Sequence, residues 1–389
     1  MRTANREPRT GLYLDHAATS PLRPEAREAM IPWLDAGNAS SQHRWGREAR
    51  TAVDAARERV ALAMGREFSE IVFTSGGTES VVLGIVGGAL GNAGRKRVLF
   101  PATEHHCVLH TEPLLRRLGF HVEILPVGRD GLLAPFAIRD DVALVSVMHA
   151  NNETGAMNDI EGWQRACRRA GAFFHTDAVQ TFGRLPMPDA DIVSVSAHKA
   201  GGPKGAGALA VRAGVSLIPL VAGGGQERER RGGTEDVAAI VGFGGVAHRR
   251  EYGYEGARAF RSRLAEGGAI LTLGDGVPTL PGIVHVRFPG VQADTLLFRL
   301  DRMGIAASAG AACSSGSLEP SHVLSASGAT VAEAKEGVRF SFRGDEDAAF
   351  GDEAARAVLD AVASVPRAGP SPPPLSHVSH MHREMGEGF

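Results

Sequence analysis

The chain has 389 residues, of which 43% are hydrophobic and 22% charged, with a formal net charge of −2 at pH 7. This ordinary globular composition predicts two or three domains, and the weak net charge excludes a basic field that would attract nucleic acid or an anionic membrane. The three cysteines are too few for a disulfide framework, which favours a reducing compartment. No apolar run reaches the length of a signal peptide or a membrane span, so we expect a soluble, cytoplasmic protein.

Short apolar runs alternate with helical patterns in the first two thirds of the chain. A helix is predicted over 45–64, where Gly65 ends an apolar face, and further helices are predicted at 78–90 and 161–170. The predicted strands lie at 70–74, 97–101, 121–125, 142–148, 172–178, 191–197 and 207–212. Such alternation is typical of an α/β protein with a mostly parallel sheet, here of seven strands, covered on both faces. We assign this pattern to a large domain, residues 12–252.

The pattern changes after this large domain. Strand patterns at 282–288 and 337–342, and a last helix over 352–365, predict a smaller α+β domain over residues 253–365. The first 20 residues are expected to pack near it. Residues 366–389 are rich in Pro, Ser and His and predict a flexible tail. Three histidines of this tail could bind a metal, although incidental occurrence is the favoured interpretation: His377, His380 and His382.

The segment "SVSAHKAGGPKGAGAL" (194–209) carries the first candidate for chemistry. Its apolar strand ends in Ser196, His198 and Lys199 and then runs into glycines. A cationic lysine is unfavourable at the end of a buried strand, so the neutral amine that Schiff-base chemistry needs is favoured there. The alternative is a surface lysine in a glycine-rich turn.

Two further segments indicate a phosphorylated cofactor. "HTDAVQ" (175–180) places Asp177 at the end of another apolar strand, where a carboxylate can pair with the protonated ring nitrogen of pyridoxal phosphate (PLP). Alternatively, Asp177 caps the next helix. "TSGGTES" (74–80) is a glycine turn that opens a helix, and its backbone N–H groups with the Thr78 hydroxyl can bind a phosphate. A capping turn without a ligand has the same pattern.

In chain order, these segments resemble a cysteine desulfurase of the NifS/IscS type, in the class V branch of the fold type I PLP enzymes. The resemblance covers nearly the whole chain and implies the fold type I transferase architecture. It rests on the segments "YLDHAATSPLRPEA", "GNASSQHRWGREAR", "IVFTSGGTES", "TEHHCVL", "MHANNETGAMNDI", "FHTDAVQTFGRLP", "SAHKAGGPKGAGAL", "GGGQERERRGGTEDV", "ASAGAACSSGSLEPSHVL" and "VRFSF".

The resemblance implies PLP as the cofactor, bound as a Schiff base to Lys199. Asp177 would lie on the pyridine nitrogen, and His105 would stack on the ring and shuttle protons. Asn152 and Gln180 would lie near the phenolic oxygen of the ring. The phosphate would be held by Thr78, the Gly77 backbone, Ser196 and His198.

The resemblance also implies a homodimer and a substrate carboxylate site. Thr234, in "RGGTE", would reach the phosphate of the partner subunit. Arg339 would bind the substrate α-carboxylate in two parallel hydrogen bonds, with Asn152 also near the substrate. A surface salt bridge is the alternative for Arg339. "EHHCVLH" (104–110) could instead be a metal cluster, but its spacing fits no common zinc pattern and no metal is expected.

The family's substrate is L-cysteine, and the resemblance gives Cys313 a role in its conversion. Lys199 would move the Cα proton, and the Cys313 thiolate would then attack the substrate sulfur, leaving a persulfide on the enzyme and releasing L-alanine. Such a thiol must be accessible and mobile, which suits the small residues of "ASAGAACSSGSLEPS" (307–321). The alternative is an inert core cysteine. For Cys107 and Cys167, both in helical patterns, packing roles are predicted.

The predicted function is therefore a PLP-dependent cysteine desulfurase that passes sulfur to an acceptor protein of unknown identity, in iron–sulfur cluster assembly, tRNA thiolation or another thiolation. The alternatives are a selenocysteine lyase, another class V PLP enzyme (a C–S lyase or an aminotransferase) and a non-catalytic sulfur-transfer scaffold. Cys313 distinguishes the persulfide mechanism, because an aminotransferase does not need it. The set of Lys199, Asp177 and His105 argues against the scaffold.

Overall fold

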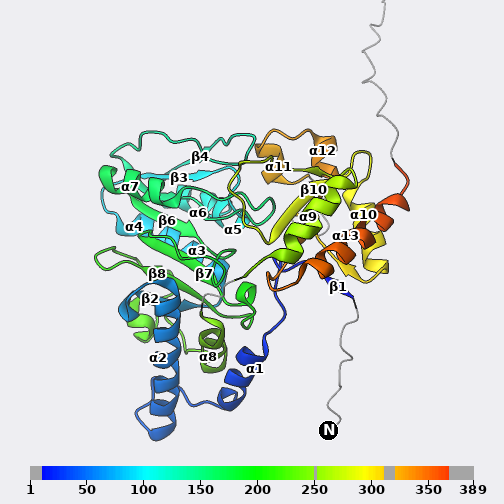
Figure 1. Cartoon of the computed structure of the whole chain (residues 1–389). Coiled ribbons are helices and arrows are strands. Elements are labelled where there is room, and N and C mark those ends of the chain that lie inside the picture. The colour runs from blue at the N-terminus through cyan, green and yellow to red at the C-terminus, as the bar shows by residue number, and fades with distance from the viewer. Residues whose placement is uncertain (1–10, 249–251, 311–319, 368–389) are drawn as a thin grey trace, which may run out of the picture.

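The computed structural model describes residues 11–248, 252–310 and 320–367 (Figure 1). Cys313 and the three histidines of the predicted tail lie outside the described residues. Within the described ranges, no helix combines the length and apolarity needed to cross a bilayer.

A seven-stranded sheet forms the centre of the larger body, in the order β2-β8-β7-β6-β5-β3-β4. All seven predicted strands are confirmed, and only β8 runs antiparallel to its neighbours. The bounds are β2 (Ile71–Thr74), β3 (Arg97–Pro101), β4 (His121–Leu125), β5 (Val142–Ser146), β6 (Phe173–Asp177), β7 (Ile192–Ser196) and β8 (Gly207–Val211). The parallel strands β5, β6 and β7 bring their carboxyl ends to one edge of the sheet.

Helices cover both faces of this sheet, because successive strand residues point to opposite sides. In β2, Ile71 and Phe73 join one apolar core, whereas Val72 joins the other. The first core is closed by α2 (Arg44–Met64), α7 (Ile160–Ala170) and α8 (Val237–Val246), against which α1 (Pro24–Met30) packs. The second is closed by α3 (Gly77–Val82), α5 (His106–Leu109) and α6 (Glu112–Arg117).

One predicted helix differs from the structure. The helix expected over 78–90 is α3 followed by a π-helical turn, Leu83–Gly87, and by α4 (Gly88–Gly91). Its glycines allow the helix to lie directly on the sheet: a Cβ added at Gly88 would come within 2.7 Å of the side chain of Ile192. Apolar periodicity predicts a helix in this region but does not distinguish an α turn from a π turn.

The smaller body has its own antiparallel sheet, β12-β10-β9, formed by β9 (Ile270–Leu271), β10 (Ile283–Arg287) and β12 (Gly337–Ser341). Its apolar core includes residues of α9 (Glu255–Glu266), α10 (Ala293–Arg302) and α13 (Ala348–Ala363). The bounds of the remaining elements are β1 (Leu12–Tyr13), β11 (Ile305–Ala306), α11 (His322–Ala326) and α12 (Val331–Glu336). β1 pairs with β11, and Leu14 enters this core. The domain boundaries stay a prediction.

The last helix begins before the predicted position of 352. The side chain of Asp347 accepts a hydrogen bond from the backbone N–H of Phe350 and caps α13, which therefore starts at Ala348. Asparagine and aspartate are favoured at this capping position, since they satisfy an N–H group that lacks a helical partner. The apolar periodicity on which the prediction rested becomes regular only after this first turn.

A strained turn precedes α8. Glu227, Arg228 and Glu229 have φ values of 48°, 56° and 65°, a left-handed run that side chains rarely adopt. Glu227 is held there by a buried ion pair, in which both carboxylate oxygens accept hydrogen bonds of 2.6 Å from the Arg57 guanidinium. It also accepts the backbone N–H of Phe73 at 2.9 Å. These contacts anchor the loop that leads to Thr234.

This turn leads to a stability prediction. Glu229 is exposed, so Glu229→Gly should relieve backbone strain without loss of a buried contact. We expect the variant to be more stable by about 1 kcal/mol, a rise in melting temperature of roughly 1–2 °C in a thermal scan. Glu227→Gly is the matched control: it relieves the same strain but leaves Arg57 buried without its partner, and it should lower the melting temperature. An unchanged or lower melting temperature for Glu229→Gly would refute the strain argument.

Candidate active site

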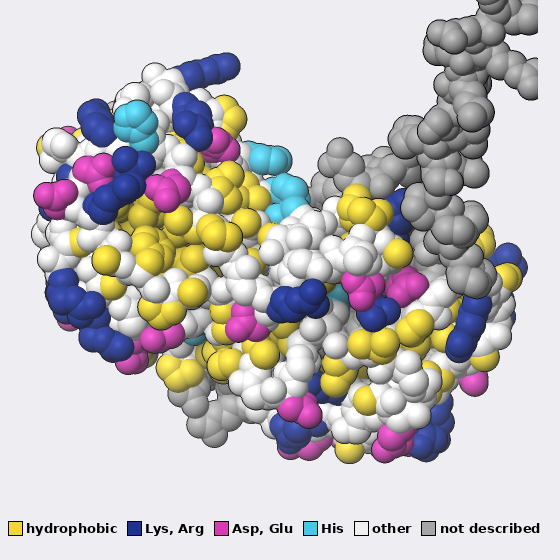
Figure 2. All heavy atoms as spheres, turned by 90° about the horizontal axis from the view of Figure 1, so that it is seen from above, with side chains coloured by type: hydrophobic (Ala, Val, Ile, Leu, Met, Phe, Trp, Pro, Cys, Tyr) yellow, Lys and Arg dark blue, Asp and Glu magenta, His cyan; other side chains and the backbone are white. Residues whose placement is uncertain are grey.

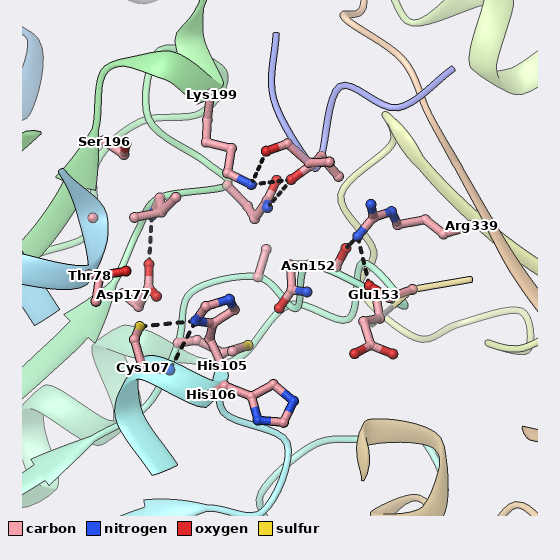
Figure 3. A pocket seen from close by; sticks show the side chains of 18 of the residues that line it. Thr78, His105, His106, Cys107, Asn152, Glu153, Asp177, Ser196, Lys199 and Arg339 are labelled. Atoms are coloured by element: carbon pink, nitrogen blue, oxygen red, sulfur yellow. Dashed lines mark hydrogen bonds between the residues drawn. The ribbon is translucent and has the colours of Figure 1, made fainter. Parts of the chain in front are cut away.

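A cavity of about 380 Å³ lies at the carboxyl edge of the central sheet, between the two bodies (Figure 3). Residues from β6, β7 and the start of α3 meet there with Arg339 of β12. The structure brings together these predicted site residues at the cavity wall: Gly77, Thr78, His105, Asn152, Asp177, Gln180, Ser196, His198, Lys199 and Arg339. Thr234 is exposed and does not line the cavity.

Lys199 lies in a 3-10 turn (His198–Ala200) directly after β7. Its Nζ donates hydrogen bonds to the carbonyl oxygens of Ala17 and, at 2.8 Å, Ala18. The amide of Gln180 also donates to the Ala17 carbonyl, at 3.0 Å. The lysine is therefore part of the cavity wall rather than of an exposed turn. The sequence did not predict that the N-terminal segment contributes to the site, because it contributes backbone carbonyls, which every residue has.

Asp177 ends β6 and faces the same cavity (Figure 3). Its Oδ1 accepts the backbone N–H of Val179 at 2.9 Å, and no helix begins between this point and β7, so the capping alternative is wrong. Burial raises the pKa of Asp177 to about 6, although the Val179 N–H and the charge of Lys199 act in the opposite direction. The carboxyl group is therefore ionised at pH 7 and can pair with a cation.

The wall of the cavity beside Asp177 presents hydrogen-bonding groups suited to a phosphate (Figure 3). Gly76 has a φ of 151°, and a Cβ added at Gly77 would lie 3.0 Å from the Val179 side chain, so this turn needs glycine. Ser196 is fully buried, and its hydroxyl has no hydrogen-bond partner among the described residues. A buried hydroxyl without a partner is costly, and a phosphate oxygen would satisfy it.

His198 also lines the cavity. Its Nδ1 lies 3.0 Å from the Thr19 hydroxyl. Burial, together with the charges of Lys199 and Lys204, lowers the pKa of His198 to about 4. The imidazole is therefore neutral at pH 7 and carries a single N–H.

Arg339 is 1% exposed and is therefore not a surface residue. One terminal nitrogen, Nη1, donates to the carbonyl oxygens of Asn152 at 2.8 Å and Gly310 at 3.2 Å. The other, Nη2, forms an ion pair with Asp15 at 2.8 Å. Nε is buried and has no hydrogen-bond partner among the described residues.

Three acidic residues near this cavity were not predicted. Asp15, in the matched segment "YLDHAATS", follows β1 and reaches Arg339 only through the pairing of the chain's start with the smaller body. Glu104 is fully buried, and burial and the charge of Asp177 raise its pKa well above the usual range. Glu153 accepts the Ser321 hydroxyl at 2.5 Å, and burial raises its pKa. The positions of these three residues depend on contacts with residues distant in sequence, which a local sequence pattern does not predict.

His105 and Cys107 form a contact at the edge of the cavity. His105 precedes α5, and its Nδ1 accepts the backbone N–H of Cys107 at 3.2 Å and lies 3.0 Å from the Cys107 Sγ. Burial, followed by Lys199 and nearby histidines, lowers the pKa of His105 to about 4. The packing prediction holds for Cys167, which is fully buried in α7, but is incomplete for Cys107, which also lines the cavity.

Histidine side chains gather at the notch between the two bodies (Figure 2). The ring of His106 lies 5.1 Å from that of His110 and 4.3 Å from that of His322. Their partial charges contribute to the low pKa of His105. No group of three or more His, Cys, Asp and Glu side chains in the described ranges is arranged to hold a metal ion.

The fold and this cavity define a fold type I PLP-dependent enzyme. PLP is the cofactor, and the residues present fit it: the ionised Asp177 suits the ring nitrogen, the unpartnered Ser196 hydroxyl suits the phosphate, and the Lys199 amine reaches the same cavity (Figure 3).

Comparisons with known proteins agree with this class. Residues 12–348 match the aminotransferase class-V family. A cysteine desulfurase IscS from Dictyoglomus turgidum is 41% identical over 85% of this chain and 89% of its own length. A solved NifS-like protein is 31% identical with a TM-score of 0.80, covering 92% of this chain and all of that one. A structure of SspA in complex with cysteine is 34% identical with a TM-score of 0.77, covering 86% of this chain and 99% of that one. The chain belongs to the class V aminotransferase family and, within it, to the cysteine desulfurases of the NifS/IscS type.

Proposed function

We propose that this enzyme converts L-cysteine to L-alanine and holds the removed sulfur as a persulfide on Cys313 for transfer to an acceptor protein. The observation that carries the proposal is the convergence of Lys199, Asp177 and Arg339, from three separate strands or turns, on one cavity. Two features of the relatives support it: several are cysteine desulfurases, and SspA was solved with cysteine bound.

Each of these side chains has a distinct task in the proposal. PLP, when bound, supplies an electron sink that acidifies the substrate's Cα–H. Lys199 holds the cofactor and moves the Cα proton through its Nζ, and the ionised Asp177 keeps the ring nitrogen protonated. Arg339 binds the substrate carboxylate, while the Asp15 and carbonyl contacts on Nη1 and Nη2 fix the plane of the guanidinium.

The persulfide step needs only the substrate and one protein thiol, and no other oxidant or reductant. The Cys313 thiolate attacks the substrate sulfur, an S–S bond forms, and the substrate Cβ–S bond breaks, so that the carbon product is alanine. Gly310 and His322 lie on either side of the Cys313 segment in the sequence, and both line the cavity, which supports access of this thiol to the substrate.

The proposal includes a homodimer in the cytoplasm and an acceptor in iron–sulfur cluster assembly, tRNA thiolation or another thiolation. Exposure of Thr234 on the loop before α8 is consistent with a contact across a subunit interface. Ile31, Leu34 and Trp45 are also exposed, at 59%, 67% and 72%.

Cys313→Ala tests the reaction. The purified, PLP-loaded variant should form alanine from L-cysteine at least about 100-fold more slowly than the parent, because the sulfur acceptor is missing. Cys167→Ala, which removes a thiol buried away from the cavity, is the control and should retain activity. Alanine formation at the parental rate in Cys313→Ala would contradict the role of Cys313 as the sulfur acceptor. Loss with L-cysteine but not with selenocysteine would favour a selenocysteine lyase.

The ion pair of Asp15 with Arg339 gives a prediction on substrate affinity. Asp15→Asn keeps a hydrogen-bond acceptor for Nη2 but removes a negative charge that opposes the substrate carboxylate. We expect the KM for L-cysteine to fall roughly three- to tenfold with little change in kcat. Asp15→Ala loses the acceptor as well and should raise KM. An increased KM in Asp15→Asn would show that the charge of Asp15 is needed for binding.

A further inference from the structure

Cys107 contacts His105 twice at the wall of the cavity. Its Sγ lies 3.0 Å from the Nδ1 of His105, and its backbone N–H donates to the same nitrogen at 3.2 Å (Figure 3). Cys107 is half-buried at the start of α5, so the position of its side chain is fixed by the helix and the core beneath it. A cysteine is not required to cap or pack this helix, which raises the question of what the thiol does.

These contacts determine which nitrogen of His105 carries the proton. A neutral imidazole has one N–H, on either Nδ1 or Nε2. A backbone N–H is always a donor, so Nδ1 must be the acceptor in that hydrogen bond and its proton must be on Nε2. The thiol can only donate to the same acceptor, and it adds a second contact that favours this tautomer.

We propose that Cys107 is a positioning residue that holds His105 as the Nε2-protonated tautomer, with this N–H facing the cofactor cavity. The ring edge opposite Nδ1 faces the open space that Lys199, Asp177 and Asn152 surround (Figure 3). The inference on the tautomer concerns the protein alone, whereas its effect on turnover rests on the proposed function.

His105 stays neutral in these surroundings, so its tautomer determines which group its ring presents to the cavity. Burial, Lys199 and the imidazoles of His106, His322 and His110 all act against a second proton on His105. At neutral pH the ring therefore carries only one N–H. Its Nε2 presents either that N–H or a lone pair to the cavity. With Nδ1 engaged by Cys107, it presents a donor, which suits an acceptor atom of the cofactor or the substrate. Reversal of the tautomer would present a lone pair at the same point.

The test is a nitrogen NMR spectrum of the His105 ring in the full-length protein, with and without PLP. Long-range proton–nitrogen correlations identify the protonated nitrogen directly. The parent should show Nε2–H. In Cys107→Ala, which keeps the backbone donor but loses the thiol, the ratio of the two tautomers should move roughly three- to tenfold toward Nδ1–H. Cys107→Ser restores a side-chain donor and should return the ratio to the parental value. Cys167→Ala should leave it unchanged.

Turnover provides the second readout. Cys107→Ala should lower kcat for L-cysteine roughly three- to tenfold with KM unchanged, and Cys107→Ser should rescue it. An Nδ1–H tautomer in the parent, or an unchanged ratio in Cys107→Ala, would overturn the proposal. A shifted ratio in a protein that forms no alanine under any condition would support the positioning role and refute the proposed function instead.

Discussion

Replacing Lys199 by alanine is expected to abolish alanine formation from L-cysteine, with a loss in kcat of about 10³-fold or more. The loss has two causes: the variant lacks the amine that holds PLP and the group that moves the Cα proton. Alanine quantified by chromatography gives the rate, and the visible absorbance of the bound cofactor, which should shift or disappear, gives a second readout. Alanine formation at the parental rate would contradict the assignment of Lys199.

A matched variant separates chemistry from folding. Lys199 also donates to the Ala17 and Ala18 carbonyls and so helps to hold the N-terminal segment against the cavity. Lys199→Arg keeps a cationic donor for these carbonyls but provides no neutral amine at pH 7. It should retain the melting temperature better than Lys199→Ala and should be as inactive. If Lys199→Arg were active, the lysine would have only a structural role.

Asp177→Asn should have the second largest effect, a loss in kcat of roughly 10²-fold or more. Asparagine occupies the same volume and can still accept the Val179 N–H, but it carries no charge to hold a proton on the ring nitrogen of the cofactor. Cofactor affinity should fall as well. The measurement is a PLP titration followed by absorbance, with alanine formation at saturating PLP as the companion assay. Unchanged kcat at saturating PLP would refute this role.

The pKa of Asp177 predicts the pH dependence of cofactor affinity. The pKa is raised to about 6, so the carboxylate is present above pH 6 and is lost as the pH falls through this value. PLP affinity of the parent should therefore decrease below about pH 6, by up to roughly tenfold per pH unit, if the pairing needs the ionised carboxyl. In Asp177→Asn this transition should be missing from the titration series. The same transition in the variant would assign it to another group.

Most of the architecture could be predicted because it is encoded locally. All seven strands of the central sheet are short apolar runs, and the strand ends place Asp177 and Lys199 at one edge by the geometry of parallel strands. Glycine at Gly76 and Gly77 marks the turn beside Ser196 for a steric reason visible in the structure. The order of the motifs then indicated the family, which the comparisons confirm.

The features that could not be predicted depend on contacts distant in sequence. Asp15 and the Ala17 carbonyl become part of the site only because β1 pairs with β11, which brings the start of the chain to Lys199 and Arg339. The raised pKa of Glu104 and the contact of Cys107 with His105 depend on burial, which a sequence pattern does not measure. The left-handed run at Glu227 is stabilised by the ion pair of Glu227 with Arg57, which lies 170 residues away in sequence.

Mass spectrometry of the Cys313 peptide after a single turnover tests the central claim most directly. The PLP-loaded enzyme is mixed with a stoichiometric amount of L-cysteine without reductant, quenched and digested, and alanine is quantified in the same sample. We expect a gain of one sulfur atom on the Cys313 peptide, in amounts equal to the alanine released. Alanine released with an unmodified Cys313 peptide, or with the added sulfur on Cys107, would contradict it.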